Sequence, residues 1–105
     1  MDILALLDSG ADCNLFNAEI AELIGIEKLE AGGIKEFYGI AGKVTAYGHE
    51  VLLNVGGHQI TTIIYFSRDV GKETVLLGME GFFDRFIVTF NRAKESTEIM
   101  PNKPK

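Results

Sequence analysis

The chain has 105 residues, a length that suits one domain and leaves no room for two ordinary ones. Its 15 acidic and 10 basic residues give a net charge of -5, which argues against binding to nucleic acid or to an anionic membrane, because both need a positive surface. Hydrophobic residues make up 47% of the sequence, so a core can form without disulfides or metals, and a single cysteine excludes an internal disulfide framework.

The N-terminal region has no targeting features. No apolar run approaches the length of a membrane span, and no basic region precedes an apolar segment as in a signal peptide. A cytoplasmic location is therefore favoured. Because Met1 and Asp2 lead directly into an apolar run, and a central strand needs neighbours on both sides, we expect that upstream sequence has been lost or trimmed.

The first expected element is a strand over residues 3–7, a short apolar run that is soon followed by Gly10. We expect it to be buried on both faces, with Asp8 at its end, beside the core but within reach of solvent. An unpaired buried carboxylate is costly, so its position here suggests chemistry. Ser9 can hydrogen-bond the neighbouring backbone, and Gly10 permits close backbone approach. An ordinary turn explains the same three residues equally well.

A short helix is expected over residues 17–24. Asn17 is a good N-cap and Gly25 is a natural stop. The polar residues 27–33 are expected to form a loop. The apolar residues expected on the helix face that packs on the sheet are Ile20, Leu23 and Ile24.

Two β-hairpins are expected between residues 34 and 66. The first has strands 36–38 and 44–47 around a tip at residues 39–42, and the second has strands 51–55 and 60–66 around a turn at residues 56–58. The first tip places Ile40 between glycines, which predicts an exposed apolar side chain.

The last third of the chain predicts another buried strand, a helical turn and a closing pair of strands. These segments are the strand 74–78, one or two helical turns over 80–86 with Phe82, Phe83 and Phe86 facing the core, and the strands 87–90 and 98–100. Many short strands with one or two short helices are typical of a mostly β barrel or folded sheet.

Three segments, taken in chain order, together indicate a protein family. They are the run from Ala5 to Asp12, the glycine-rich hairpin from Tyr38 to Gly42, and the run from Val75 to Gly78 before a short helix. Over roughly residues 3–100 the chain resembles the single-domain retropepsin-like aspartic proteases, most closely their bacterial and transposon-derived members. The resemblance implies an all-β fold, the retropepsin-like barrel, which corresponds to half of a bilobal aspartic protease. This domain would span residues 1–100, and residues 101–105 would form a disordered tail.

The resemblance also implies an aspartic endopeptidase that acts as a homodimer on a peptide or protein substrate. The sequence agrees, because it contains one Asp-Ser-Gly motif and each copy would supply one Asp8. Like charges about 3 Å apart cannot both ionise, so one proton would be shared between the two carboxylates. The ionised oxygen would take a proton from water, and the protonated partner would polarise the scissile carbonyl. No metal, cofactor or covalent intermediate is required.

Carried over by resemblance, the catalytic loop consists of Asp8, Ser9 and Gly10, with Ser9 locking the two active loops together. Gly10 would offer its backbone to the substrate strand. The hairpin tip would be a flap that closes over the peptide. The residues expected to contact substrate are Ala11, Asp12, Cys13, Tyr38, Gly39, Ile40, Ala41, Gly42 and Leu76.

Two departures from the family pattern bear on activity. Family members usually carry Arg after Leu-Leu-Gly, where it pairs with the acid that corresponds to Asp12, but this chain has Met79. The β-hairpin that usually precedes the Asp-Ser-Gly strand, and that helps form the dimer interface, is almost entirely lacking. The alternative is therefore a catalytically silent domain, or a truncated fragment of a protease, that serves peptide binding or dimerisation.

Other chemistries are weaker interpretations of the same residues. The turn from Gly39 to Lys43 lacks the Gly-Lys-Ser/Thr ending of a phosphate loop. His49 and His58 lie without Cys or acids at metal-ligand spacing, so we expect solvated histidines near hairpin ends. Cys13 has no nearby His in the sequence and is expected to be a partly buried thiol rather than a nucleophile. Tyr38 either acts on the flap or merely packs there.

Overall fold

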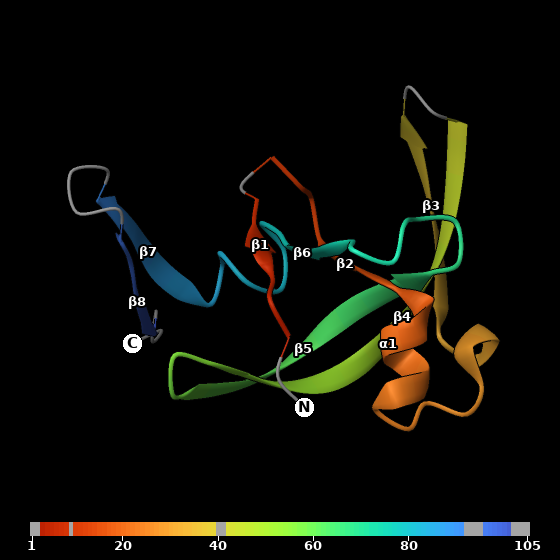
Figure 1. Cartoon of the computed structure of the whole chain (residues 1–105), viewed down its shortest axis with the longest axis horizontal. Helices are drawn as coiled ribbons and strands as arrows, with labels where there is room; N and C mark the ends of the chain where they lie inside the picture. Colours follow the sequence, from red (N-terminus) through yellow and green to blue (C-terminus); the bar gives the residue numbers. More distant parts are fainter. Residues whose placement is uncertain (1–2, 9, 40–41, 92–95, 102–105) are drawn as a thin grey trace.

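The computed structural model describes residues 3–8, 10–39, 42–91 and 96–101. Its strands form a six-stranded sheet in the order β1-β6-β2-β5-β4-β3 and a two-stranded sheet of β7 and β8 (Figure 1). The elements are β1 Leu6–Leu7, β2 Asn14–Asn17, α1 Ala18–Leu23, the 3-10 helix η1 Leu29–Ala31, β3 Gly33–Gly39, β4 Gly42–Val55, β5 His58–Ser67, β6 Val75–Leu77, β7 Phe86–Asn91 and β8 Ser96–Pro101. The predicted all-β architecture with little helix is confirmed.

Strand β1 lies at one end of the six-stranded sheet, where it pairs in parallel with β6. The expectation of a strand buried on both faces over residues 3–7 is wrong: only Leu6 and Leu7 are in a strand, and Leu4 and Leu6 are 96% and 61% exposed. The reason is topological, since among the described strands β1 has a neighbour on one side only. The buried strand of this region is β6, which lies between β1 and β2.

Helix α1 begins and ends where the sequence predicts. Asn17 is the N-cap, and its Oδ1 accepts a 2.8 Å hydrogen bond from the backbone N–H of Glu19. Ile20 and Ala21 pack into the core, whereas Leu23 and Ile24 are 69% and 40% exposed, so the predicted apolar face was only partly right.

The predicted polar loop at residues 27–33 contains η1, whose Leu29 is buried. One apolar side chain therefore anchors this connection to the core.

The two predicted hairpins share the long strand β4. Its first half pairs with β3 and its second half with β5. Val55 lies opposite His58, so the second turn has two central residues, Gly56 and Gly57, with φ of 55° and 81°. Positive φ at both positions is the type I′ geometry that follows the twist of the strands and that glycine adopts without strain. Residues 40 and 41 of the first tip lie outside the described residues.

The predicted helical turns at residues 80–86 are instead a set of hydrogen-bonded turns. Gly81 has φ of 94°, which a right-handed helix does not permit, so the helix prediction is wrong here. The N–H groups of Phe83 and Asp84 donate to the carbonyls of Gly78 and Met79. The aromatic prediction holds better, because Phe82 and Phe86 are buried and Phe83 packs against them.

The core lies between α1, the β4–β5 hairpin and the turns after β6. Phe16 and Phe66 meet edge to face with ring centroids 5.9 Å apart, a geometry that aromatic pairs favour. Phe66 and Phe82 are fully buried. Strands β7 and β8 form the predicted closing hairpin, and no helix in the described part of the chain is long and apolar enough to cross a membrane.

Candidate functional site

The carboxylate of Asp8 lies in a loop that begins at the carboxyl end of β1. The backbone N–H of Asp8 donates to the carbonyl of Leu77 at 2.9 Å, and the N–H of Ala11 donates to the carbonyl of Asp8 at 3.0 Å. The N–H of Gly10 donates to Asp8 Oδ1 at 2.9 Å. A Cβ at position 10 would lie 3.2 Å from the same oxygen, so a larger residue would crowd the carboxylate. The loop therefore fixes a half-buried Asp8 at the position that the sequence predicts.

The rest of this loop is attached to the segment that follows β6. The N–H groups of Met79 and Glu80 each donate at 2.8 Å, to the carbonyls of Ala11 and Asp12 respectively. Gly78 lies so close that a Cβ there would be 2.5 Å from the Cys13 carbonyl oxygen and 2.7 Å from that of Ala11. Only a residue without a side chain fits this approach. The two predicted motifs, Asp-Ser-Gly and Leu-Leu-Gly, are thus parts of one unit.

Asn14 completes this unit and was missed by the sequence analysis. Its side chain is fully buried, and its Oδ1 accepts a 3.0 Å hydrogen bond from the N–H of Gly78. Its Nδ2 donates to the carbonyl of Ile63 at 3.1 Å. Thr62, also buried, donates its hydroxyl to the carbonyl of Gly81 at 2.6 Å. The signal for this network in the sequence was the polar Asn14 directly before the apolar Leu15 and Phe16 of β2.

An apolar strip flanks the Asp8 loop on one face of the sheet. Leu6 lies opposite Leu76, and Leu76 lies opposite Leu15, so the three side chains share a face. Asp8 follows Leu6 by two residues, which places it toward that face by strand alternation. Leu6 is 61% exposed, and the other two are half-buried. The predicted substrate residue Leu76 therefore lies on the face of the sheet toward which alternation places Asp8.

Asp12 and Cys13 have different environments although they are neighbours. Asp12 is exposed, and no ion pair to it is found among the residues that the structure describes, in line with Met79 at the position where the family usually has Arg. Cys13 is 4% exposed, and burial raises the pKa of its thiol above 9.0. The thiol is therefore more buried than the partly buried thiol that the sequence predicts.

The β3–β4 hairpin carries the predicted flap residues. Tyr38 is 77% exposed and lies opposite Lys43, while Gly39 lies opposite Gly42. The Tyr38 hydroxyl donates to Glu36 Oε2 at 2.9 Å, and Lys43 Nζ lies 3.5 Å from Glu36 Oε1. The hydrogen bond from Tyr38, followed by the charge of Lys43, lowers the pKa of Glu36. The Tyr38 contact therefore lies within β3, and the Glu36–Lys43 ion pair joins β3 to β4.

The structure does not bring all predicted site residues together. No hydrogen bond in the described part of the chain joins the β3–β4 hairpin to the Asp8 loop, and Figure 1 shows this hairpin projecting from the rest of the sheet. The predicted residues Ser9, Ile40 and Ala41 lie outside the described residues. At the base of the hairpin, Lys35 Nζ lies 5.4 Å and 5.2 Å from the ring centroids of Phe37 and Tyr65.

The histidines are less solvated than predicted. His49 lies within β4 rather than near a hairpin end, and its Nε2 is 2.7 Å from the carbonyl oxygen of Leu29. The ring of His58 packs against Phe86 with centroids 6.1 Å apart. Both side chains are half-buried, so their roles are contacts between elements.

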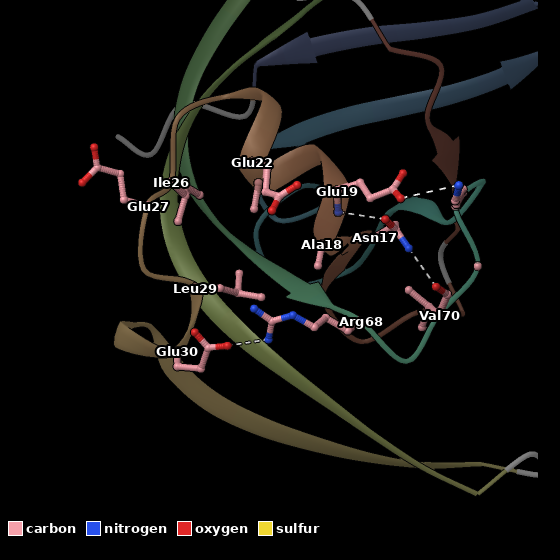
Figure 2. A pocket seen from close by; sticks show the side chains of 13 residues that line it. Asn17, Ala18, Glu19, Glu22, Ile26, Glu27, Leu29, Glu30, Arg68 and Val70 are labelled. Atoms are coloured by element: carbon pink, nitrogen blue, oxygen red, sulfur yellow. Dashed lines mark hydrogen bonds and ion pairs between the residues drawn. The ribbon is translucent and has the colours of Figure 1, made fainter.

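A cleft of about 450 Å³ lies between α1, η1 and the loop after β5 (Figure 2). Two basic side chains line it, and each is paired with a glutamate. Arg68 Nη1 contacts Glu30, and Lys72 Nζ lies 3.6 Å from Glu19 Oε1. Asn17 Nδ2 donates to the Val70 carbonyl at 2.8 Å. These contacts fasten the loop after β5 to α1 and η1, and the Asp8 loop does not line this cleft.

No family model matches the sequence, and no curated protein sequence matches it either. Among solved structures, the fold is similar to that of the EIAV protease complexed with the inhibitor HBY-793. The TM-score is 0.54, with 20% sequence identity, and the match covers 71% of this chain and 68% of that chain. The chain thus has a retropepsin-like fold.

Proposed function

We propose that the chain is an aspartic endopeptidase that acts as a homodimer and hydrolyses extended peptides, with Asp8 of each copy supplying one carboxylate. The observation that carries the proposal is the position of Asp8 at the carboxyl end of β1, half-buried and held by hydrogen bonds to Leu77 and Gly10, in a retropepsin-like fold. A loop held at both its flanks can place a carboxylate reproducibly, as catalysis requires.

In the proposed reaction the two Asp8 carboxylates share one proton, because two like charges so close together cannot both ionise. The ionised carboxylate accepts a proton from water as that water attacks the peptide carbonyl carbon. The protonated carboxylate donates its proton toward the carbonyl oxygen. This first step forms a C–O bond, converts the C=O bond to C–OH and gives a gem-diol. In the second step the carboxyl that took the water proton donates it to the amide nitrogen, and the other carboxylate accepts a proton from a gem-diol hydroxyl. The C–N bond then breaks, an amine and a carboxylic acid leave, and the pair again holds one proton.

The strip formed by Leu6, Leu15 and Leu76 is an observation that favours an extended substrate with apolar side chains. It lies on the face toward which Asp8 points by alternation, and Leu6 is largely exposed. We propose that substrate side chains pack on it, while Gly10, Ala11 and Asp12 border the peptide backbone. Cys13, at 4% exposed, is too buried to contact that backbone directly. The β3–β4 hairpin would act as the flap, with Tyr38, Gly39 and Gly42 near its tip.

The test is a cleavage assay on a mixed fluorogenic peptide library with the parent chain and Asp8→Asn. We expect cleavage by the parent and its loss in Asp8→Asn. Glu27→Gln is the matched control, because it removes an exposed carboxylate outside the Asp8 loop and should leave cleavage unchanged. Equal cleavage by the parent and Asp8→Asn would reject the proposed role of Asp8.

The second candidate is a catalytically silent domain on the same fold that binds peptides or mediates dimerisation. It is favoured by the exposed Asp12, which lacks an ionic partner among the described residues while Met79 stands after Gly78. Sedimentation equilibrium, run alongside the cleavage assay, distinguishes the two candidate functions. A dimer that never cleaves supports the silent domain, whereas a cleaving dimer supports the protease.

A further inference from the structure

The face of the sheet that carries the apolar strip continues beyond β2 toward the β3–β4 hairpin. Tyr65 of β5 lies opposite Leu15 of β2, so these two side chains share that face. The ring of Tyr65 lies over β4, because a Cβ at Gly48 would be only 2.8 Å from the Tyr65 Cε1 atom. The missing side chain at Gly48 therefore leaves room for this ring to reach toward β3.

Lys35 of β3 places a positive charge at the far end of the same face. Its Nζ lies 5.4 Å and 5.2 Å from the ring centroids of Phe37 and Tyr65, and the two rings are inclined at 81°. Cation–π contacts of this kind attract an ammonium group to the faces of aromatic rings. All three side chains are half-buried. The ammonium group is therefore held in one place and still within reach of solvent.

This ammonium group has no carboxylate partner in the part of the chain that the structure describes. An ammonium group has three N–H donors, and aromatic faces balance its charge only in part. A carboxylate brought to this point would therefore complete its pairing. The ion pairs among the described residues use other basic side chains, namely Lys43 with Glu36, Arg68 with Glu30 and Lys72 with Glu19.

The charge of Lys35 also acts on the strand that follows the Asp8 loop. Burial, the largest influence, raises the pKa of the Cys13 thiol, and the charge of Lys35, the next largest, opposes this rise. The carboxylates of Asp12 and Glu80 act less strongly on the same thiol. Both carboxylates are exposed, so water and salt screen them from an approaching anion. Because Coulomb interactions weaken with distance, the charge of Lys35 lies within reach of the proposed substrate site.

We infer that the substrate of this site carries an acidic side chain, Asp or Glu, that pairs with Lys35 while its apolar neighbours pack on the apolar strip. The inference rests on the proposed function, which places an extended peptide over the strip. Three strands lie between β6, which carries Leu76, and β3, which carries Lys35, so the acidic residue stands away from the scissile bond. Two copies would supply one Lys35 each, and an acidic residue is therefore accepted on either side of that bond.

The test is the binding of a blocked peptide, Thr-Val-Ser-Ala-Leu-Leu-Ala-Ser-Val-Thr, in which one residue at a time is replaced by Glu, Gln or Lys. Every chain in the titrations carries Asp8→Asn, so that the peptide stays intact whether or not the parent cleaves it. Isothermal calorimetry at low ionic strength measures the Kd. At one or more positions outside the central Leu-Leu pair, Glu should bind about fivefold or more tightly than Gln, and Lys should bind more weakly than Gln.

Variants of Lys35 identify the group that recognises the acid. Lys35→Met keeps most of the apolar stem and should remove the preference for Glu, whereas Lys35→Glu should invert it in favour of Lys. Lys43→Met is the matched control. It removes a lysine from the same hairpin that points to the other face by alternation and pairs with Glu36, so the preference for Glu should persist. The preference should also shrink as the salt concentration rises.

The inference is overturned if no peptide binds saturably, if Glu and Gln bind equally at every position, or if Lys35→Met keeps the preference. Failure of the protease proposal looks different. A parent chain that cleaves no peptide, although the Glu peptide binds through Lys35, would reject hydrolysis and support the acidic preference. Cleavage by the parent without a Lys35-dependent preference in binding would do the reverse. Circular dichroism of each variant establishes that it is folded before the titration.

Discussion

The side-chain oxygen of Asn14 accepts a 3.0 Å hydrogen bond from the backbone N–H of Gly78. This bond joins the strand that follows the Asp8 loop to the end of β6, and it lies in the buried interior. Because Met79 and Glu80 donate to Ala11 and Asp12 just beyond it, the Asn14–Gly78 pair holds the two segments in register. The position of Asp8 therefore depends on a buried amide that takes no part in chemistry.

The first prediction concerns this amide. Asn14→Ala should lower the free energy of unfolding by about 1 to 3 kcal/mol, since it leaves the buried Gly78 N–H without its partner and removes the donor to the partly buried Ile63 carbonyl. Urea unfolding followed by circular dichroism measures the change. Asn54→Ala, on an exposed position of β4, is the control and should change stability by no more than about 0.5 kcal/mol. A small effect at Asn14 would show that the network is dispensable.

The second prediction tests the close approach at Gly78. Gly78→Ala should destabilise the fold by about 1 to 3 kcal/mol and reduce any cleavage activity, because its Cβ would press on the carbonyls of Cys13 and Ala11. Gly33→Ala is matched to it, because a Cβ there meets nothing within 4 Å. Thermal unfolding of the two variants should differ clearly, and equal melting temperatures would contradict the packing of the loop against β6.

The hairpins and α1 could be predicted because their signals are local. The Gly56-Gly57 pair selects a tight turn, and Asn17 caps a helix whichever partners that helix later packs on. The burial of the run at residues 3–7 could not be predicted, since an apolar run looks the same in an edge strand and a central one. Asn14 was missed for a related reason: only the pairing of β2, β5 and β6 shows that its amide is buried and satisfied.

The third prediction concerns pH and the β3–β4 hairpin. The pKa of Glu36 lies below its ordinary value of 4.5, first because of the hydrogen bond from Tyr38 and then because of Lys43. Tyr38→Phe should therefore raise the Glu36 pKa, which carboxyl NMR titration measures directly. Because the folded pKa is lowered, this contact helps the hairpin above pH 4.5 and is lost as the pH falls through the folded pKa. An unchanged Glu36 pKa in Tyr38→Phe would show that the hydrogen bond does not persist in solution.

The fourth prediction distinguishes a shared site from a site within one chain. Equal amounts of parent and Asp8→Asn chains, allowed to exchange partners, should give about a quarter of the dimers with both carboxylates. Cleavage per total chain should therefore fall to about a quarter of the parent value, provided that a mixed dimer is inactive. A fall to one half would mean that each chain works alone. The folded control Glu27→Gln, mixed with the parent in the same way, should leave cleavage per total chain unchanged.

The most direct test of the proposed shared site is the dependence of the initial cleavage rate on the concentration of the parent chain. If two Asp8 carboxylates from two copies form the site, the rate should rise with the square of chain concentration while most chains are monomeric, and become linear once dimers predominate. A rate that is linear throughout, or no cleavage where sedimentation shows a dimer, would contradict the proposal that two chains build one aspartic protease site.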